Sequence, residues 1–328
     1  MANEKKSAVF YILKILQEDS DEKHKLTYQA IADKLYSNYG IEIERKTIAS
    51  CIDLLEEQGY EIVKCGKNGL YLGEREFEEG ELLFLIDAIY SSKSMPTKYA
   101  KDLVGRLTKS FSRYEKKRFS HLEKIDDGTR ADNREIFWTI ELLNDAIESG
   151  KKVEFQYGAY GIDKKLQLKG DGKFYKINPY FMVNNRGKYY LVCNYDNHDG
   201  ISNNKIECIS NVRILDEDKK PIETLEGGEN FSIKEYIKEH IYMVSGKTID
   251  ASVCIADEKR VNDFIDWFGK DVSFLKQNDK IIANIRVNEE ALIYWALQYG
   301  EHVEIVAPET TREKIKERIE KMNQKYHN

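Results

Sequence analysis

The sequence predicts an α+β protein built from several domains. Apolar residues recur at helical spacing in the first 75 residues, ahead of two short strand-like runs. The stretch Lys173–Tyr195 holds two aromatic-rich runs around the turn Asn184–Gly187, which is typical of a β-hairpin. The last 80 residues alternate strand-like and helix-like segments. At 328 residues, the chain is long enough for about two to four domains, each with its own core.

The composition is that of a soluble protein, with 33% charged and 41% hydrophobic residues. No apolar run approaches the ~20 residues that cross a bilayer, and the first 17 residues read as an amphipathic helix rather than a signal peptide. We therefore expect a cytoplasmic protein without a membrane partner. The cysteines are scattered singly, without metal-ligand spacing, so reduced thiols and neither metal nor cofactor are expected: Cys51, Cys65, Cys193, Cys208 and Cys254.

Residues 1–75 predict three helices followed by a two-stranded hairpin. Thr27 is a good N-cap for the second helix, and Ile48, Ile52 and Leu55 share one face of the third. Gly59 ends that helix, and the runs 60–63 and 70–72 can pair across the loop between them. This order predicts a winged helix-turn-helix domain.

A third helix of this length fits the major groove of DNA and presents its first turns to base edges. The start of the second helix and the hairpin would then hold phosphates. The candidate DNA-binding residues are Thr27, Tyr28, Gln29, Arg45, Lys46, Thr47, Ser50, Lys64, Lys67 and Asn68. The same charges also suit an ordinary solvated surface, and winged helices also serve as protein-interaction modules. Because the net charge is −6, a DNA-binding face must be a local patch.

Residues 76–132 predict a helical linker. Two amphipathic helices are expected on either side of a break at Ser94–Pro96. The run Lys116–Arg118 suits either DNA contact or a solvated surface. The polar stretch Asp126–Asp132 predicts a domain edge, after which a helix over Ile136–Ser149 leads into the next domain.

Residues 133–222 predict one helix and five short strands, typical of a small barrel. The first strand follows Gly150, and the others are expected at 164–169, 174–183, 188–195 and 205–215. Pro179 lacks an N–H, so it should interrupt its strand or lie at an edge. His198 reads as a surface residue, and no pair of carboxylates has acid–base spacing. We therefore expect no catalytic residues and no enzymatic activity.

Two motifs resemble a known family. Pro179, Gly187 and the run Tyr189–Leu191 resemble the core motif of the WYL domain, with Tyr189 in place of the usual Trp. The stretch Arg45–Ile52 resembles the RRTVxRDI run of the regulators that carry this domain. The resemblance implies an Sm-like β-barrel in a bacterial ligand-responsive regulator, and a helical linker that contributes to dimerisation.

The resemblance also implies a basic and aromatic pocket for an anionic ligand, a nucleotide or a strand of nucleic acid. The family run FRLDRI matches NKIECI here, so that Lys205 and Cys208 take the places of two arginines. Lysine offers a point charge instead of a bidentate fork, and cysteine offers no charge. The implied ligand-binding residues are Tyr175, Lys176, Tyr190, Lys205 and Cys208. The alternative is a barrel kept as a dimerisation or linker module.

Residues 223–247 predict a linker with one short helix, and 248–328 a β-α-β-β-α-β order, which is that of a ferredoxin-like fold. The stretch from Ala291 to Ile319 resembles the extension that follows WYL domains and serves in dimerisation. Trp267, Trp295 and Tyr299 read as core or dimer-contact aromatics rather than as rings that stack on a ligand.

These features together predict a homodimeric, ligand-responsive, DNA-binding transcriptional regulator. Its expected partners are double-stranded DNA, a nucleotide or single-stranded nucleic acid ligand, and a second copy of the chain. The alternative is a nucleic-acid-binding accessory or modulator protein of a defence system, without operator-specific binding. The complete helix–helix–hairpin unit favours the first, whereas the acidic net charge and the small residues Ala49 and Ser50 favour the second.

Overall fold

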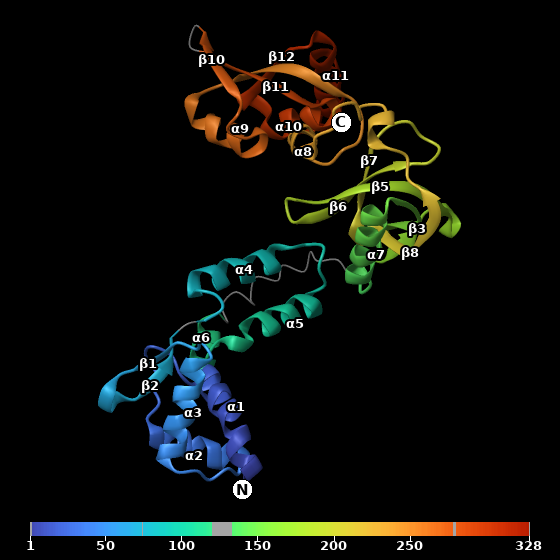
Figure 1. The fold of residues 1–328 in the computed structure, drawn as a ribbon. Coiled ribbons are helices and arrows are strands. Elements are labelled where there is room, and N and C mark those ends of the chain that lie inside the picture. Colours follow the sequence, from blue (N-terminus) through green and yellow to red (C-terminus); the bar gives the residue numbers. More distant parts are fainter. Residues whose placement is uncertain (1, 74, 120–132, 278–279, 328) are drawn as a thin grey trace. The chain divides into compact units, whose positions relative to one another are not determined.

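The computed structural model describes residues 2–73, 75–119, 133–277 and 280–327 (Figure 1). The chain divides into two compact units, residues 1–132 and 133–328. The predicted break at Asp126–Asp132 and the tip of the hairpin at 278–279 lie outside the described residues. Within the described residues, no helix combines the length and the apolar character that a membrane span requires.

The first unit begins with three helices and a two-stranded antiparallel hairpin, as the apolar periodicity predicts. Thr27 caps the second helix by accepting a hydrogen bond from the N–H of Ala30 at 3.1 Å. Ile12, Ile31 and Ile52 are fully buried where the helices meet. The elements are α1 (Ala2–Asp19), α2 (Tyr28–Tyr39), α3 (Arg45–Glu57), β1 (Ile62–Lys64) and β2 (Leu70–Leu72).

The hairpin is attached to the start of α2. Leu26 pairs with Leu70 through two backbone hydrogen bonds of 2.9 Å. Next to this bridge Gly69 has φ +100°, and a Cβ there would lie 2.4 Å from the carbonyl oxygen of Leu26. Only glycine fits this position, so the backbone itself fixes the hairpin beside the first turn of α2.

The rest of the first unit is helical. The predicted break at Ser94–Pro96 is confirmed, because α4 (Glu79–Ser91) ends before it and α5 (Thr97–Leu107) begins after it. Ser112 then caps α6 (Arg113–Arg118) in a capping box with Glu115. Leu82, Ile86, Val104, Phe111 and Phe119 form a separate apolar core.

The second unit opens with α7 (Ile136–Ser149), as predicted, and a six-stranded antiparallel sheet. Five strands follow the order β4-β3-β5-β6-β7, and β8 pairs with β3. The strands are β3 (Lys151–Tyr160), β4 (Leu166–Leu168), β5 (Phe174–Asn185), β6 (Lys188–Tyr195), β7 (Ser202–Lys205) and β8 (Ile209–Asp218).

One strand prediction was wrong. The sequence predicts a single strand over 205–215, but the chain forms β7, a 3₁₀ turn at Ile206–Cys208, and then β8. β7 pairs with β6 and β8 with β3, so the chain must turn between two different partner strands. Ile206 begins this turn and Ile209 follows it, and both are apolar and buried, as strand residues would be. The sequence therefore gives no signal for the turn.

The hairpin of β5 and β6 is confirmed. Arg186 and Gly187 have φ values of +51° and +78°, the left-handed pair that a two-residue hairpin turn requires. Pro179 faces Cys193, and a bulge follows between Pro179 and Phe181. The pairing of β5 with β3 ends at Ile177, so the missing N–H of Pro179 falls where β3 offers no partner.

The carboxy-terminal part is a four-stranded antiparallel sheet with the order β10-β11-β9-β12, covered by helices. The predicted β-α-β-β-α-β order is present. Trp295, which is 1% exposed, packs against Phe264 and Phe268, and Trp267 donates a hydrogen bond to the Tyr299 hydroxyl at 2.8 Å. The elements are α8 (Ile233–Glu239), β9 (Thr248–Ile255), α9 (Val261–Phe268), β10 (Ser273–Gln277), β11 (Lys280–Asn288), α10 (Glu289–Tyr299), β12 (Val303–Ala307) and α11 (Glu309–Tyr326).

Candidate nucleic-acid interface and ligand cavity

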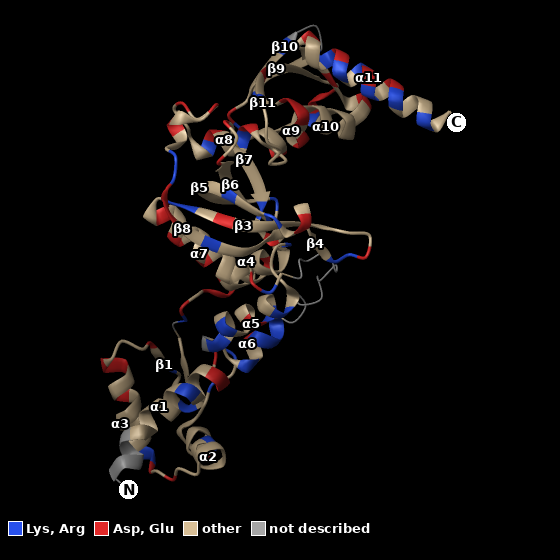
Figure 2. Cartoon of the chain, turned by 90° about the vertical axis from the view of Figure 1, so that its right-hand side faces the viewer, with Lys and Arg blue, Asp and Glu red and all other residues tan. Residues whose placement is uncertain are grey.

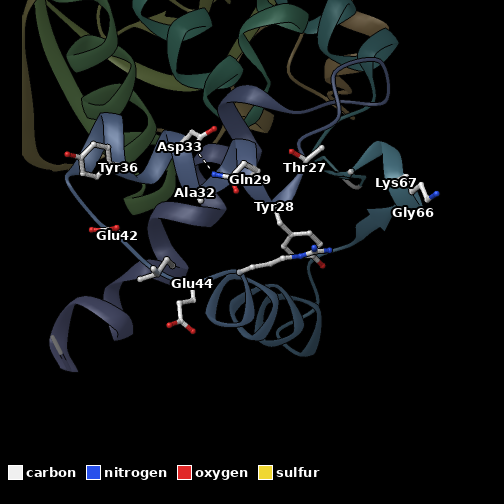
Figure 3. Close-up of a pocket in the computed structure, with 13 residues that line it drawn as sticks. Thr27, Tyr28, Gln29, Ala32, Asp33, Tyr36, Glu42, Glu44, Gly66 and Lys67 are labelled. Carbon is white, nitrogen blue, oxygen red and sulfur yellow. Dashed lines mark hydrogen bonds between the residues drawn. The ribbon is translucent and has the colours of Figure 1, made fainter.

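A hollow of about 860 Å³ lies on the first unit, between the start of α2, the start of α3 and the β1–β2 hairpin (Figure 3). It brings together half of the predicted DNA-binding residues. Those that line it are Thr27, Tyr28, Gln29, Arg45 and Lys67. The structure thus places residues from three separate elements around one concave surface.

Several polar side chains in this hollow are already oriented by their neighbours. The Thr27 hydroxyl caps α2, and Gln29 Nε2 donates to Asp33 Oδ1 at 2.9 Å (Figure 3). The Arg45 guanidinium lies 5.2 Å from the centre of the Tyr28 ring, a cation–π contact between α3 and α2. Arg45 therefore projects from the first turn of α3 into the hollow with its guanidinium exposed.

The charge of the hollow is mixed. Asp33, Glu42 and Glu44 line it together with the cations Arg45 and Lys67. The amino-terminal ends of α2 and α3 both meet it, and each adds the partial positive charge of a helix start. An anion in this hollow would be held by the helix starts and two cations, against the repulsion of three carboxylates.

The other predicted DNA-binding residues lie outside the lining. Lys46 and Ser50 are exposed on α3, Thr47 is half-buried there, and Asn68 is exposed in the hairpin. Lys64 is engaged by α3, because its Nζ lies 2.7 Å from Glu56 Oε2 and 3.2 Å from Asp53 Oδ1. The hydrogen bond to Glu56 raises the pKa of Lys64, so its ammonium stays charged and paired with carboxylates of α3.

A second cavity of about 590 Å³ lies on the second unit, at the ends of β5 and β6. Tyr175 and Lys176 line it, as does Tyr195, whose ring meets that of Tyr175 edge-to-face at 5.9 Å. Lys173 Nζ lies 5.9 Å from the centre of the Tyr175 ring, and the His198 ring meets Tyr195 at 6.1 Å. The cavity is therefore aromatic, with two lysines and one carboxylate, Asp196, in its lining.

Burial raises the pKa of Tyr195 to about 12, and its hydroxyl donates to Asn204 Oδ1 at 2.9 Å. The phenol is neutral near pH 7 and does not repel an anion. Lys176 forms an ion pair with Glu217, whereas Lys173 forms no ion pair within the described residues. Lys173 is therefore the cation that this cavity offers to a ligand.

Three of the five predicted ligand-binding residues are elsewhere. Tyr190 packs with Val183 and Tyr236 on the other face of β6 and lies opposite Lys205 on β7. Cys208 is 6% exposed, and burial raises the pKa of its thiol. Tyr190, Lys205 and Cys208 thus do not line this cavity, and their role in ligand binding stays a prediction.

The sequence did not single out Lys173 and Tyr195 as ligand contacts, and it indicated a surface role for His198. The available signal was the two-residue spacing of Lys173 and Tyr175 at the start of β5, which places both side chains on one side of the extended chain. In the described parts of the chain, no three His, Cys, Asp or Glu side chains gather in a way that could hold a metal ion.

Comparison with known proteins adds two domain assignments. The family model of the WYL domain matches residues 139–214, and that of the WCX domain matches residues 247–322. No curated protein matches the chain significantly. The chain therefore carries a WYL domain followed by a WCX domain.

Similar solved structures include proteasome accessory factor B/C (PafBC) of Arthrobacter aurescens, at 12% identity and a TM-score of 0.29. That alignment covers 94% of this chain and 47% of the PafBC chain, so this chain spans about half the length of PafBC. A second is the crystal structure of a CRISPR Cas-related protein, at 16% identity and a TM-score of 0.40, covering 99% of this chain and 85% of that chain.

Proposed function

We propose that the protein is a DNA-binding transcriptional regulator whose WYL domain senses an anionic ligand. In this proposal, residues 1–75 are a winged helix-turn-helix domain that reads duplex DNA and 76–132 a helical linker. Residues 133–222 form an Sm-like barrel, 223–247 a linker, and 248–328 a ferredoxin-like extension that serves in dimerisation. The observation that carries it is the convergence of α2, α3 and the hairpin on one hollow containing Arg45.

Each element has a role on DNA in this proposal. The first turn of α3 offers Arg45 and Lys46 to base edges in the major groove. The start of α2 offers free N–H groups to a phosphate, and Lys67 reaches the neighbouring backbone from the hairpin. A homodimer would present two such units to an inverted repeat.

The variant Arg45→Ala tests whether the first turn of α3 contacts base edges. We expect the variant to lose about 1–3 kcal/mol of binding to a duplex selected from a random pool, because an arginine–guanine pair has that value. Binding to unselected duplex should weaken much less. Fluorescence anisotropy at a fixed salt concentration measures both.

Lys14→Ala is the matched control, since Lys14 also carries a cation over a tyrosine ring, 5.8 Å from the centre of Tyr39, but lies outside the hollow. It should leave both affinities unchanged. If Arg45→Ala weakened selected and unselected duplexes equally, α3 would not read bases.

The sensing role rests on the cavity of the second unit. Lys173 and the rings of Tyr175 and Tyr195 suit a phosphate attached to a flat ring, such as a nucleotide, whereas Asp196 in the same lining opposes the phosphate. We expect Lys173→Gln to remove a charge-assisted hydrogen bond of about 1.5–3 kcal/mol and to weaken nucleotide binding roughly tenfold to hundredfold.

Calorimetry with nucleotides and short single strands measures this effect. Lys165→Gln is the control, because Lys165 is exposed on the same domain but does not line the cavity. If the unmodified protein bound neither nucleotides nor short single strands, the WYL domain would serve as a scaffold and not as a sensor of such ligands.

A nucleic-acid-binding accessory protein without an operator is the second candidate. Three carboxylates line the hollow, Asp33, Glu42 and Glu44, and they favour it because they oppose close approach of phosphates. Such a protein would bind selected and random duplexes with equal affinity.

A further inference from the structure

The most basic stretch of the described chain lies outside both cavities. Residues 97–118, which form α5 and α6, contain eight Lys and Arg but only two Asp and Glu. The whole chain has a net charge of −6, and residues 1–73 contain ten Lys and Arg against twelve Asp and Glu. Positive charge in the first unit is therefore concentrated on α5 and α6, where Figure 2 shows Lys and Arg side by side.

These cations lie on the solvent face of α5 and its continuation. Lys98, Lys101, Arg106 and Lys109 are exposed, whereas Ala100 and Val104 on the opposite face are buried in the core. Within the described residues, none of these four forms an ion pair with a carboxylate. By contrast, Lys151 and Lys152 of the second unit are each paired with two carboxylates. The charge on α5 is therefore available to a partner.

A buried polar junction attaches α6 to the end of α1. Ser112 donates from its hydroxyl to Asp21 Oδ2 at 2.9 Å, and Arg113 forms an ion pair with Asp19, which is almost fully buried. Burial acts to raise the pKa of Asp21, but hydrogen bonds from His24 and Ser112 outweigh it and hold the pKa below its usual value. The carboxylate is therefore ionised and fully engaged near pH 7.

The junction also places α6 close to the hollow. The ring of Tyr114 stacks on His24 with 3.7 Å between centres. His24 precedes Thr27, a lining residue, by three positions, so their Cα atoms are at most about 11 Å apart. The exposed residues Lys23 and Lys25 lie in the same short connection. With the exposed Glu22 beside them, these two lysines add one net positive charge between the start of α2 and α6.

We propose that α5 and its continuation to Lys109 form a second, sequence-independent contact with duplex DNA, binding the phosphate backbone beside the segment read at the hollow. This inference rests on the proposed function. Flexible lysines on a helix face suit phosphates and carry no base-reading geometry. The contact supplies the electrostatic affinity that the acid-lined hollow lacks, because each neutralised phosphate releases counterions.

The test uses the full-length triple variant Lys98→Gln, Lys101→Gln and Lys109→Gln. Lys270→Gln, Lys280→Gln and Lys321→Gln together form the control, since these exposed lysines of the second unit give the same change in net charge. Affinity is measured across a salt series for selected and random duplexes. One selected duplex is trimmed to the protected bases, and another is extended on both sides.

We expect the α5 variant to bind extended duplexes roughly tenfold or more weakly, whether selected or random, with a log–log salt slope shallower by about one unit per lysine. The trimmed duplex should lose much less, and the control should match the unmodified protein. Selectivity for the operator should stay unchanged.

An unchanged salt slope in the α5 variant, with the unmodified protein still binding DNA, overturns this inference and leaves the proposed function standing. Loss of binding to anionic vesicles or to an acidic protein, with DNA binding intact, also overturns it. If the unmodified protein binds no duplex at all, both the inference and the proposed function fail.

Discussion

Replacing Arg75 with alanine is expected to lower the unfolding free energy of the first unit by about 3–5 kcal/mol, because it removes a buried cation that pairs with the partly buried Glu115 and donates to two carbonyls. The Arg75 side chain is 8% exposed. Its guanidinium donates to the carbonyl oxygens of Ser20 at 2.6 Å and Gln17 at 3.3 Å, and it lies 3.5 Å from Glu115. One side chain thus joins the end of α1 to α6.

Urea unfolding followed by circular dichroism measures the change, and Arg106→Ala is the control. Arg106 is exposed on α5, so its loss should stay within about 0.5 kcal/mol. A change of that size for Arg75→Ala would show that α6 is held by its other contacts alone.

The same variant links stability to DNA binding. Without Arg75, α6 keeps the contacts of Ser112, Arg113 and Tyr114. It loses the ion pair between Glu115 and the guanidinium that also binds the carbonyls at the end of α1. The basic surface of α5 and α6 would then move relative to the hollow. We therefore expect Arg75→Ala to bind the trimmed and the extended duplex with similar affinity. The affinities are measured at temperatures where the first unit remains folded.

The local elements of this chain follow from the sequence because their causes are local. The apolar spacing of Ile48, Ile52 and Leu55 predicts the buried face of α3, and Thr27 predicts the start of α2 through its own hydroxyl. The turn Asn184–Gly187, with its asparagines and its glycine, predicts the β5–β6 hairpin for the same reason. The WYL motif adds the domain assignment.

A β-bulge in β5 decides which rings line the cavity of the second unit, and the sequence does not reveal this bulge. Counted from the turn at Asn185 and Lys188, Tyr195 would face Asn178, but the bulge after Pro179 moves it opposite Ile177. Tyr195 thereby comes to the same face as Tyr175. A single extra residue in one strand thus decides which rings meet.

Whether the Lys64 ammonium contacts a phosphate or a carboxylate depends on contacts between elements that are distant in the sequence. A lysine on the hairpin suits a phosphate, but Asp53 and Glu56 of α3 lie within 3.2 Å of its Nζ. Only the packing of the hairpin on α3 brings these groups together. Arg45 and Lys67 remain exposed because their neighbours are an aromatic ring and solvent.

Trp295→Ala is expected to lower the unfolding free energy of the WCX domain by about 3–5 kcal/mol, the usual cost of removing a buried aromatic ring. Trp295 lies in the centre of the carboxy-terminal core, with the rings of Phe264 at 5.4 Å and Phe268 at 5.0 Å. α10 carries it between the sheet and α9. Its loss leaves a cavity that the strands cannot close.

Trp295→Phe should cost much less, for a specific reason. The Trp295 Nε1–H is buried and finds no acceptor among the described residues. An unpaired buried donor costs about 1–3 kcal/mol, so phenylalanine removes that penalty while it keeps most of the ring contacts. Trp138→Ala is the control, because Trp138 is 62% exposed and its loss should leave the unfolding midpoint unchanged. Denaturant unfolding of the three variants, followed by near-ultraviolet circular dichroism, separates these outcomes. Equal losses for Trp295→Phe and Trp295→Ala would mean that the indole N–H is paired and contributes to stability.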